Sequence, residues 1–219
     1  MSVAWVRAQL RDAFGRWGLP RLARVDNGYP WGSKGDLPTD LALWLIGLGV
    51  PVWWNDPRRP QQNGVVERSQ GTAKRWAEPH TAASPEALQA RLDELDALQR
   101  GQYPYRQQQS RLQWFATLAH SGRAYRAADE AGQWQWERVA AHLAVYCVSR
   151  KVDQKGQISV YNRNHYVGVK HRQRVVEVMF DAERCQWVVA DEHGHILKEI
   201  VAEEVRAERI LALEVTCRR

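Results

Sequence analysis

The order of hydrophobic patterns in the first third of the chain constrains its fold most. Apolar residues recur at helical spacing over residues 3–17, and a short apolar strand ends at Val25. A second helix is predicted over residues 39–48, followed by a strand over residues 50–54 and a third helix after Gly64. Because helices and strands alternate, the sequence predicts an α/β layer with parallel strand pairing.

Two carboxylates stand at the ends of these patterns. Asp26 closes the first strand in the run Arg-Val-Asp-Asn-Gly, and Glu67 lies early in the third helix, after a loop rich in proline and glycine. An acid at a strand end and an acid on a helix face predict a shared cleft, and their oxygens suit Mg²⁺ or Mn²⁺. The alternatives are an Asp that caps its own turn and an ordinary surface Glu. We expect four residues to shape the loops beside the two acids: Asn27, Gly28, Asn63 and Gly64.

The spacing and surroundings of these acids carry a family resemblance. R-x-D-N-G is followed, about forty residues later, by P-x-x-P-Q-x-N-G-x-V-E-R. In this order the motifs resemble the second and third acidic positions of the DDE transposase and retroviral integrase superfamily, especially the integrase-core transposases of bacterial insertion sequences. The resemblance covers most of the chain. It implies a partial RNase H-like catalytic core in which Asp26 and Glu67 bind Mg²⁺ or Mn²⁺ for DNA strand cleavage and transfer.

The resemblance also implies what this stretch lacks. In that family the first catalytic Asp lies on a strand well upstream of the D-N-G strand, and the present sequence starts too late to contain it. We therefore expect a C-terminal part of a transposase that does not nick or join DNA alone, with DNA (transposon ends and target) and further copies of the chain as partners. Three alternatives stay open: an upstream-encoded fragment that supplies the Asp, a non-catalytic DNA-binding remnant that regulates transposition, and a gene-decay product.

The helix that carries Glu67 has two distinct faces. At 3.6 residues per turn, one face holds Glu67, Gln70, Gly71 and Lys74, and another holds Val66, Ser69, Ala73 and Trp76. We expect the second face to be buried and the first to look into the cleft. Lys74 would then bind phosphates of the DNA strand that is cut. The alternative is an exposed lysine on a solvated helix.

Residues 81–142 are predicted to be a helical connector. Ser84 is a good N-cap, Pro85 suits the first helical position, and Gly101 ends the helix. Positive and negative charges are balanced over this segment, and it contains no catalytic pattern. The connector is a candidate for dimerisation.

The pattern changes near residue 143. Short runs of β-type composition alternate with turn signals up to residue 200, which predicts a small all-β barrel. Residues 150–174 hold seven basic side chains, a single acid (Asp153) and the aromatic residues Tyr161, His165 and Tyr166. This composition suits contact with a nucleic acid backbone, and the alternative is an ordinary solvated face. The predicted DNA-binding residues are Arg150, Lys151, Lys155, Arg163, Lys170, Arg172 and Arg174.

The composition of the chain limits the kind of partner and the cellular compartment that we expect. The 219 residues are 44% hydrophobic, ample for a packed core, and a net charge of +6 favours a polyanionic partner. Three cysteines without a C-x-x-C pair argue against a disulfide framework, and no apolar run is long enough to cross a membrane, so we expect a cytoplasmic protein. His193-x-His195 beside Asp191 is better explained by a hairpin turn than by a zinc site. The predicted domains are 1–80 (partial RNase H-like core), 81–142 (connector), 143–200 (basic β-barrel) and 201–219 (a tail of unassigned role).

Overall fold

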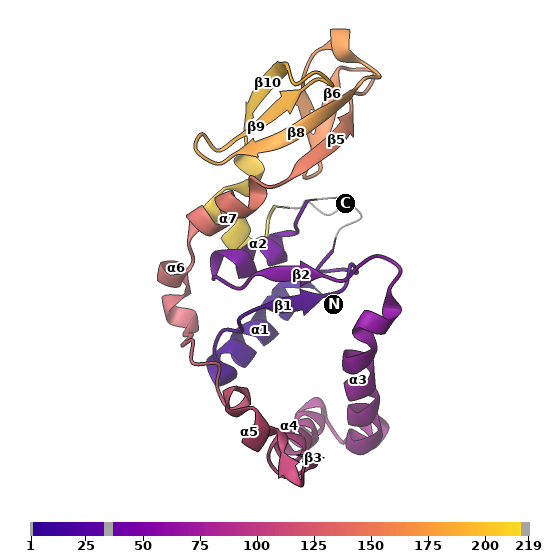
Figure 1. Cartoon of the computed structure of the whole chain (residues 1–219), viewed down its shortest axis with the longest axis vertical. Helices are drawn as coiled ribbons and strands as arrows, with labels where there is room; N and C mark the ends of the chain where they lie inside the picture. Colours follow the sequence, from indigo (N-terminus) through magenta and orange to yellow (C-terminus); the bar gives the residue numbers. More distant parts are fainter. Residues whose placement is uncertain (1, 33–36, 216–219) are drawn as a thin grey trace. The chain divides into compact units, whose positions relative to one another are not determined.

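The computed structural model of the protein describes residues 2–32 and 37–215, which form a mixed α/β structure (Figure 1). Within these residues, no helix is both long enough and apolar enough to cross a membrane. Packing divides the chain into two compact units, each made of segments that are separate in the sequence. The four consecutive domains predicted from the sequence stay a prediction. The first unit consists of Met1–Leu10, Arg21–Trp54 and Ala127–Arg219, and the second of Arg11–Pro20 and Asn55–Arg126.

The first unit contains the parallel strand pair that the sequence predicts. Strand β1 (Ala23–Val25) lies beside strand β2 (Val52–Trp54) in parallel, with Val25 opposite Trp54. Helix α2 (Asp40–Gly47) makes the connection between the two strands. Parallel strands need such a crossover, since a tight hairpin would make them antiparallel. The predicted α/β arrangement of this stretch is confirmed.

Helix α2 is buried along its whole length. All its residues are buried, and residues 41–44 have no exposed surface. A helix that is apolar on every side needs cover on every side. Strand β2 supplies part of this cover, and two later helices supply more: α7 (Trp136–Leu143) and α8 (Ala207–Ala212). Thr39 caps the helix as predicted, because its hydroxyl accepts a hydrogen bond from the Ala42 N–H.

Two contacts join α2 to the short helix α6 (Glu130–Gln133) and the residue after it. The indole Nε1 of Trp44 donates a 3.1 Å hydrogen bond to Oε1 of Glu130, a buried carboxylate. Gly47 lies against the indole of Trp134, and a Cβ at position 47 would come within 2.0 Å of the indole nitrogen. Only glycine allows this approach, so the packing of α2 depends on it.

The C-terminal part of the first unit is β-rich, as predicted, but its main sheet is open. Strands β10, β9, β8 and β5 form an antiparallel sheet in that order, and β6 pairs with β7 in a separate hairpin (Figure 1). The predicted closure into a barrel is not observed in the described residues, because β10 and β5 are opposite edges of the sheet and do not pair with each other. The strands are β5 (Cys147–Lys151), β6 (Gln157–Val160), β7 (Arg163–Tyr166), β8 (Val175–Asp181), β9 (Gln186–Ala190) and β10 (Ile196–Val201).

Alternation along the central strands buries one face of this sheet. Val176, Val178 and Phe180 are the buried residues of β8, and they are separated by more exposed ones. Phe180 stands opposite Trp187 of β9, and the two ring centroids are 5.1 Å apart. Both aromatic residues are buried, so this pair is part of the core that the sheet covers.

The segment after β10, to which the sequence assigned no role, is part of the core of the first unit. Glu204 lies in the short helix η6 (Glu203–Val205) and has no exposed surface. Its Oε1 is hydrogen-bonded to Nε2 of His165 on β7. Helix α8 follows directly and packs on α2. Residues up to 215 therefore connect the hairpin to the buried helix.

The second unit is mainly helical. Helix α3 (Gly64–Ala77) packs against α4 (Pro85–Gly101), and α4 packs against α5 (Arg111–Trp114). The bounds of α4 match the prediction, and its Ser84 cap accepts the Ala87 N–H at 3.2 Å. Between α4 and α5 lies a hairpin that the sequence did not predict, formed by β3 (Pro104–Arg106) and β4 (Gln109–Ser110).

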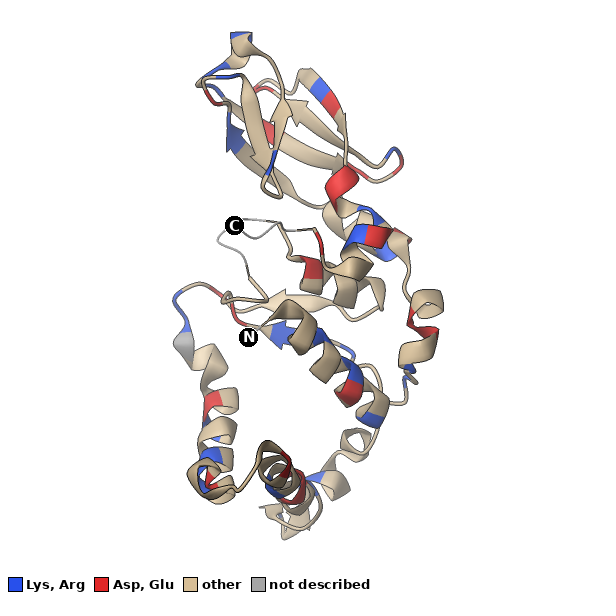
Figure 2. Ribbon diagram, turned by 180° about the vertical axis from the view of Figure 1, so that it is seen from behind, with Lys and Arg blue, Asp and Glu red and all other residues tan. Residues whose placement is uncertain are grey.

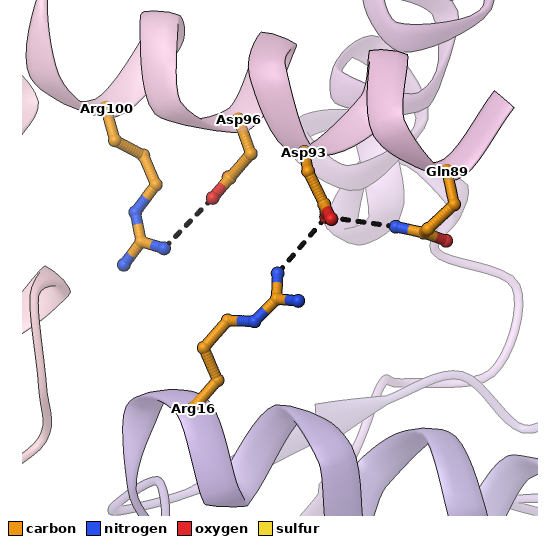
Figure 3. A network of polar contacts seen from close by, with 5 residues as sticks. All are labelled: Arg16, Gln89, Asp93, Asp96 and Arg100. Carbon is orange, nitrogen blue, oxygen red and sulfur yellow. Dashed lines mark hydrogen bonds and ion pairs between the residues drawn. The ribbon is translucent and has the colours of Figure 1, made fainter. Parts of the chain in front are cut away.

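A polar network joins helix α1 (Val3–Trp17) to α4 in the second unit (Figure 3). Arg16 Nη1 donates to Asp93 Oδ1 at 3.1 Å, and the guanidinium of Arg16 also lies over the ring of Trp17. The hydrogen bond from Arg16 lowers the pKa of Asp93, and a second hydrogen bond adds to this effect. Gln89 Nε2 donates this second bond to Asp93 Oδ1 at 3.0 Å, and a separate pair on the same helix joins Arg100 Nη1 to Asp96 Oδ2, also at 3.0 Å.

Asp40, the first residue of α2, is a carboxyl in an unfavourable place. Its side chain is buried, at 3% exposure, and its Oδ1 accepts a 2.8 Å hydrogen bond from the Leu41 N–H. Burial raises the pKa of Asp40 above the ordinary value of 3.8, although this hydrogen bond and the charge of Arg7 act in the opposite direction. The folded chain therefore holds this proton more tightly than the unfolded chain. The protonated Asp40 side chain therefore contributes to stability fully below pH 3.8, the ordinary pKa, and this contribution is lost as pH rises through the pKa of the folded state.

We expect Asp40→Asn to raise the free energy of unfolding, relative to the parent protein, more at neutral pH than in acid. The amide removes the charge that burial disfavours, and the parent loses this disadvantage itself when Asp40 is protonated. Urea unfolding across the pH range measures the difference. The matched control is Asp93→Asn, whose carboxyl has a lowered pKa. It should destabilise the protein near neutral pH and lose this effect as pH falls, and parallel pH profiles for the two variants would contradict the assignment.

Candidate functional site

Asp26 lies directly after β1, exposed, at the start of a tight turn. Its Oδ1 accepts a 3.0 Å hydrogen bond from the Gly28 N–H. The carbonyl of Gly28 in turn accepts the N–H groups of Trp31 at 2.9 Å and Gly32 at 2.8 Å. The turn-capping role that the sequence left open is therefore present. The second carboxylate oxygen, Oδ2, forms no hydrogen bond with the described residues and is available to a ligand.

The loop after Asp26 is held by contacts that the sequence did not reveal. The indole of Trp54 on β2 donates to the carbonyl of Trp31 at 3.0 Å, and the hydroxyl of Thr39 donates to the same oxygen at 3.3 Å. Gly32 passes so close to Asn27 that a Cβ would lie 2.2 Å from the Asn27 carbonyl oxygen. Gly32 is thus a shaping residue of this loop that sequence reasoning missed, since a glycine in a loop rich in glycine and proline gives no separate signal.

Glu67 lies in the first turn of α3 and is exposed. The loop before it is tied by side chains: Asn55 Nδ2 donates to Asn63 Oδ1, and Gln62 exchanges two hydrogen bonds with Asp56, at 2.9 and 3.0 Å. Asn63 therefore takes part in shaping the loop. The backbone of Gly64 is helical, with φ −56° and ψ −29°, and a Cβ there would meet no atom within 4 Å. Any residue could adopt this conformation.

The predicted burial of the second face of α3 is wrong. Val66 is 57% exposed and Trp76 is 48% exposed, and residues 65–70 are exposed throughout. The reason is the position of its partner helix. Helix α4 meets the C-terminal end of α3, where Ala77 is buried and its carbonyl accepts a hydrogen bond from Arg91. Helical spacing identifies a face, but it does not say whether another element covers that face.

The two acids belong to different units, Asp26 to the first and Glu67 to the second, and their convergence on one cleft stays a prediction. In the part of the chain that the structure describes, no group of three His, Cys, Asp or Glu residues is arranged to hold a metal ion. Each acid nevertheless keeps a carboxylate oxygen that has no partner among the residues that the structure describes. Such oxygens fit the ligand preference of Mg²⁺ and Mn²⁺. Lys74 is exposed on α3 and forms no ion pair with the described residues.

The structure brings five of the predicted DNA-binding residues together. Backbone hydrogen bonds join the turn that follows β5 to the turn that precedes β8: Gly168 N–H donates to the Gly156 carbonyl, and Val152 N–H to the Arg174 carbonyl. The cations on these turns form what we call the basic end of the sheet (Figure 2). The basic end consists of Lys151, Lys155, Lys170, Arg172 and Arg174.

No carboxylate among the described residues neutralises the basic end. All five cations are exposed and form no ion pair in this part of the chain. Asp153, the single acid of the stretch, uses its Oδ1 to accept the N–H groups of Lys155 and Gln157, both at 2.8 Å. One oxygen of Asp153 is thus engaged by the turn backbone, and Asp153 forms no ion pair with the described residues. The cations remain available for an anionic partner.

The remaining predicted contacts lie elsewhere. Arg163 lies beside the tight turn of the β6–β7 hairpin, and this turn is at the end of the hairpin away from the basic end. Arg150 is half-buried and donates from Nε to the Ser159 carbonyl at 2.9 Å. Tyr161 is buried, with its hydroxyl donating to the Pro38 carbonyl at 2.8 Å. Of the three aromatic residues expected to contact DNA, only Tyr166 is exposed, because Tyr161 is buried and His165 is paired with Glu204.

Asp191 forms the hairpin turn expected between β9 and β10. Its Oδ1 accepts hydrogen bonds from the N–H groups of His193 and His195, each at 2.9 Å.

A comparison of the chain with models of known protein families finds no match. The functional assignment therefore depends on the two acidic motifs and on the chemistry of the surfaces described above.

We expect Gly32→Ala to destabilise the loop beside Asp26, whereas Gly64→Ala should be tolerated beside Glu67. The added methyl at 32 meets backbone atoms of Asn27, so the loop must move, at a cost of about 3 kcal/mol. The methyl at 64 meets open space in a helical residue, where alanine is favoured over glycine by about 1 kcal/mol. Thermal unfolding of both variants measures the difference. Equal loss of stability at both positions would contradict this account.

Proposed function

We propose that the chain is part of an integrase-core (DDE) transposase that acts in metal-dependent DNA cleavage and strand transfer during DNA integration. The observation that carries the proposal is the ordered pair of motifs, R-x-D-N-G and P-x-x-P-Q-x-N-G-x-V-E-R, around Asp26 and Glu67. A helix-linked parallel strand pair ahead of the Glu67 helix supports an RNase H-like core as the fold of this part. Each acid is exposed, as a residue that meets substrate must be.

Asp26 and Glu67 would hold Mg²⁺ or Mn²⁺. Bound ions of this kind activate the attacking oxygen and stabilise the leaving oxygen of an in-line displacement. The chain itself orients the ligands. The Gly28 N–H fixes one oxygen of Asp26 and leaves the other for a ligand, and the Asn55–Asn63 contact holds the loop from which the Glu67 helix starts. The resembled enzymes use a third carboxylate, and we propose that an upstream-encoded segment supplies it.

The basic end would bind the DNA backbone of transposon ends or target. Five exposed cations that form no ion pair with the described residues would attract phosphates and release the counterions that surround DNA. Lys74, two helical turns after Glu67, would contact the strand that is cut. Assembly of several copies on DNA and a cytoplasmic location belong to the same proposal.

A second candidate is a non-catalytic DNA-binding protein that regulates transposition by occupying element ends. Two features favour it: the basic end stands complete within the described residues, whereas no third acid there joins Asp26 or Glu67. The two candidates share DNA binding and differ in strand cleavage. Separate experiments on these two properties therefore distinguish them.

The affinity of the full chain for duplex DNA should decline steeply as the salt concentration rises. The basic end should account for part of this salt dependence. The double variant Lys170→Ala/Arg172→Ala removes two phosphate contacts, so the slope of log K against log salt should fall by about 2. The control Lys198→Ala/Arg184→Ala removes the same charges from strand β10 and the β8–β9 turn, and it should leave the slope unchanged. Fluorescence anisotropy measures both. Identical slopes for the two double variants would exclude the basic end as the DNA site.

For cleavage, we expect the chain alone to leave supercoiled DNA intact in Mg²⁺ or Mn²⁺. Addition of an upstream segment that carries an Asp-bearing strand should produce nicked circles. Asp26→Ala and Glu67→Ala should each abolish this nicking, with duplex binding retained as the control for folding. Nicking by the chain alone that disappears in Asp26→Ala would show that no further carboxylate is needed. Nicking by the mixture that survives both substitutions would reject the acids as ligands.

A further inference from the structure

The charge of the connector is balanced as a whole but strongly segregated along the chain. Residues 97–128 contain no Asp or Glu. The acids of the connector precede or follow this stretch. Its charged side chains are therefore all basic, and the stretch includes the hairpin β3–β4, helix α5 and the residues after them. Its basic residues are Arg100, Arg106, Arg111, Arg123 and Arg126.

Exposed aromatic rings gather on the same stretch. They belong to the β3–β4 hairpin and to the end of α5, and each is between 38% and 49% exposed. Two arginines are interleaved with them: the guanidinium of Arg106 lies 5.2 Å from the ring of Tyr105 and 6.0 Å from that of Trp114, and Arg111 lies 5.5 Å from Tyr105. We call this set the aromatic–arginine surface. It consists of Tyr103, Tyr105, Arg106, Arg111, Trp114 and Phe115.

Local contacts hold this surface in place. Trp114 Nε1 donates to the Arg106 carbonyl at 3.0 Å, and Arg111 donates to the Gln99 carbonyl at 2.9 Å. Ser110 starts α5 with a capping box that includes hydrogen bonds to and from Gln113. The rings are thus ordered before any partner arrives, which reduces the entropy lost on binding.

The chemistry of the surface selects a polyanion with flat faces. Among the described residues, neither Arg106 nor Arg111 forms an ion pair, so both charges stay uncompensated. Exposed rings beside free cations suit bases that stack and phosphates that pair with the cations. Duplex DNA hides its base faces, whereas a single strand presents them. Charge complementarity and the exposed rings therefore favour single-stranded nucleic acid as the occupant.

We propose that the aromatic–arginine surface binds single-stranded nucleic acid, with bases stacked on Trp114 and Phe115 and phosphates bound by Arg106 and Arg111. This site differs in composition from the basic end, because it combines two arginines with four exposed rings, whereas the basic end consists of five lysines and arginines. The proposal does not depend on the transposase assignment, because it rests on the residues of this surface alone.

The test is anisotropy titration of the full chain with a labelled oligothymidylate of about 12 nucleotides, a length within the usual site size. Trp114→Leu/Phe115→Leu keeps apolar bulk but removes two stacking faces, and it should weaken binding about tenfold to hundredfold. Trp114→Tyr/Phe115→Tyr keeps the aromatic faces and should retain most of the affinity. Trp5→Leu, which removes an exposed ring from α1, should bind as the parent does.

Further arms separate folding, duplex binding and protein partners. Duplex affinity and thermal unfolding of the leucine variant should match those of the tyrosine variant, and Arg106→Gln should also weaken oligonucleotide binding. Lys170→Ala/Arg172→Ala should lose duplex affinity but keep affinity for the single strand. Oligonucleotide affinity equal to the parent in the leucine variant would overturn the proposal. If the leucine variant with unchanged affinity also changes from an oligomer to a monomer in sedimentation, the surface joins copies of the chain instead of binding nucleic acid.

Discussion

The complete burial of helix α2 is the constraint on which the first unit depends. Each fully buried leucine or isoleucine contributes about 1.5–3 kcal/mol, whereas an exposed ion pair contributes about 0–1 kcal/mol. The apolar side chains of α2 therefore outweigh surface charges in stabilising this unit. The residues that cover the helix come from β2, α7 and α8, which are far apart in sequence. Asp40 is the polar exception, and its position at the helix start lets the Leu41 N–H reduce the cost of burying its carboxyl.

The surfaces proposed to be functional are arranged differently from this core. Asp26 and Glu67 are exposed. A hydrogen bond within its own turn orients Asp26, and short-range hydrogen bonds hold the loop from which the Glu67 helix starts. Loops on a rigid support commonly carry function in this way. In the functions proposed above, the basic end and the aromatic–arginine surface would make two kinds of contact with nucleic acid. The first is defined by five lysines and arginines, which suit a duplex backbone, and the second combines two arginines with exposed rings, which suit unpaired bases.

Several predictions from sequence agree with the structure because their signals are local. Helix α1 spans the predicted residues, Thr39 and Ser84 cap the helices that follow them, and β1 and β2 are parallel. Other predictions are wrong because they required knowledge of a distant partner. The face with Val66 and Trp76 is exposed because α4 meets α3 at the far end of that helix, and Tyr161 is buried. The main sheet is open because, in the described residues, β5 and β10 do not pair with each other.

The sequence by itself determined the longer helices, several of the strands, the two acidic motifs and the excess of cations, because spacing, caps and residue type act over a few neighbouring positions. Only the tertiary structure decided which faces are covered, which cations gather and which aromatic rings stay exposed. Burial and charge pairing depend on residues that are distant in the chain and close in space. Gly32 beside Asn27 and Glu204 beside His165 are contacts that no local pattern contains.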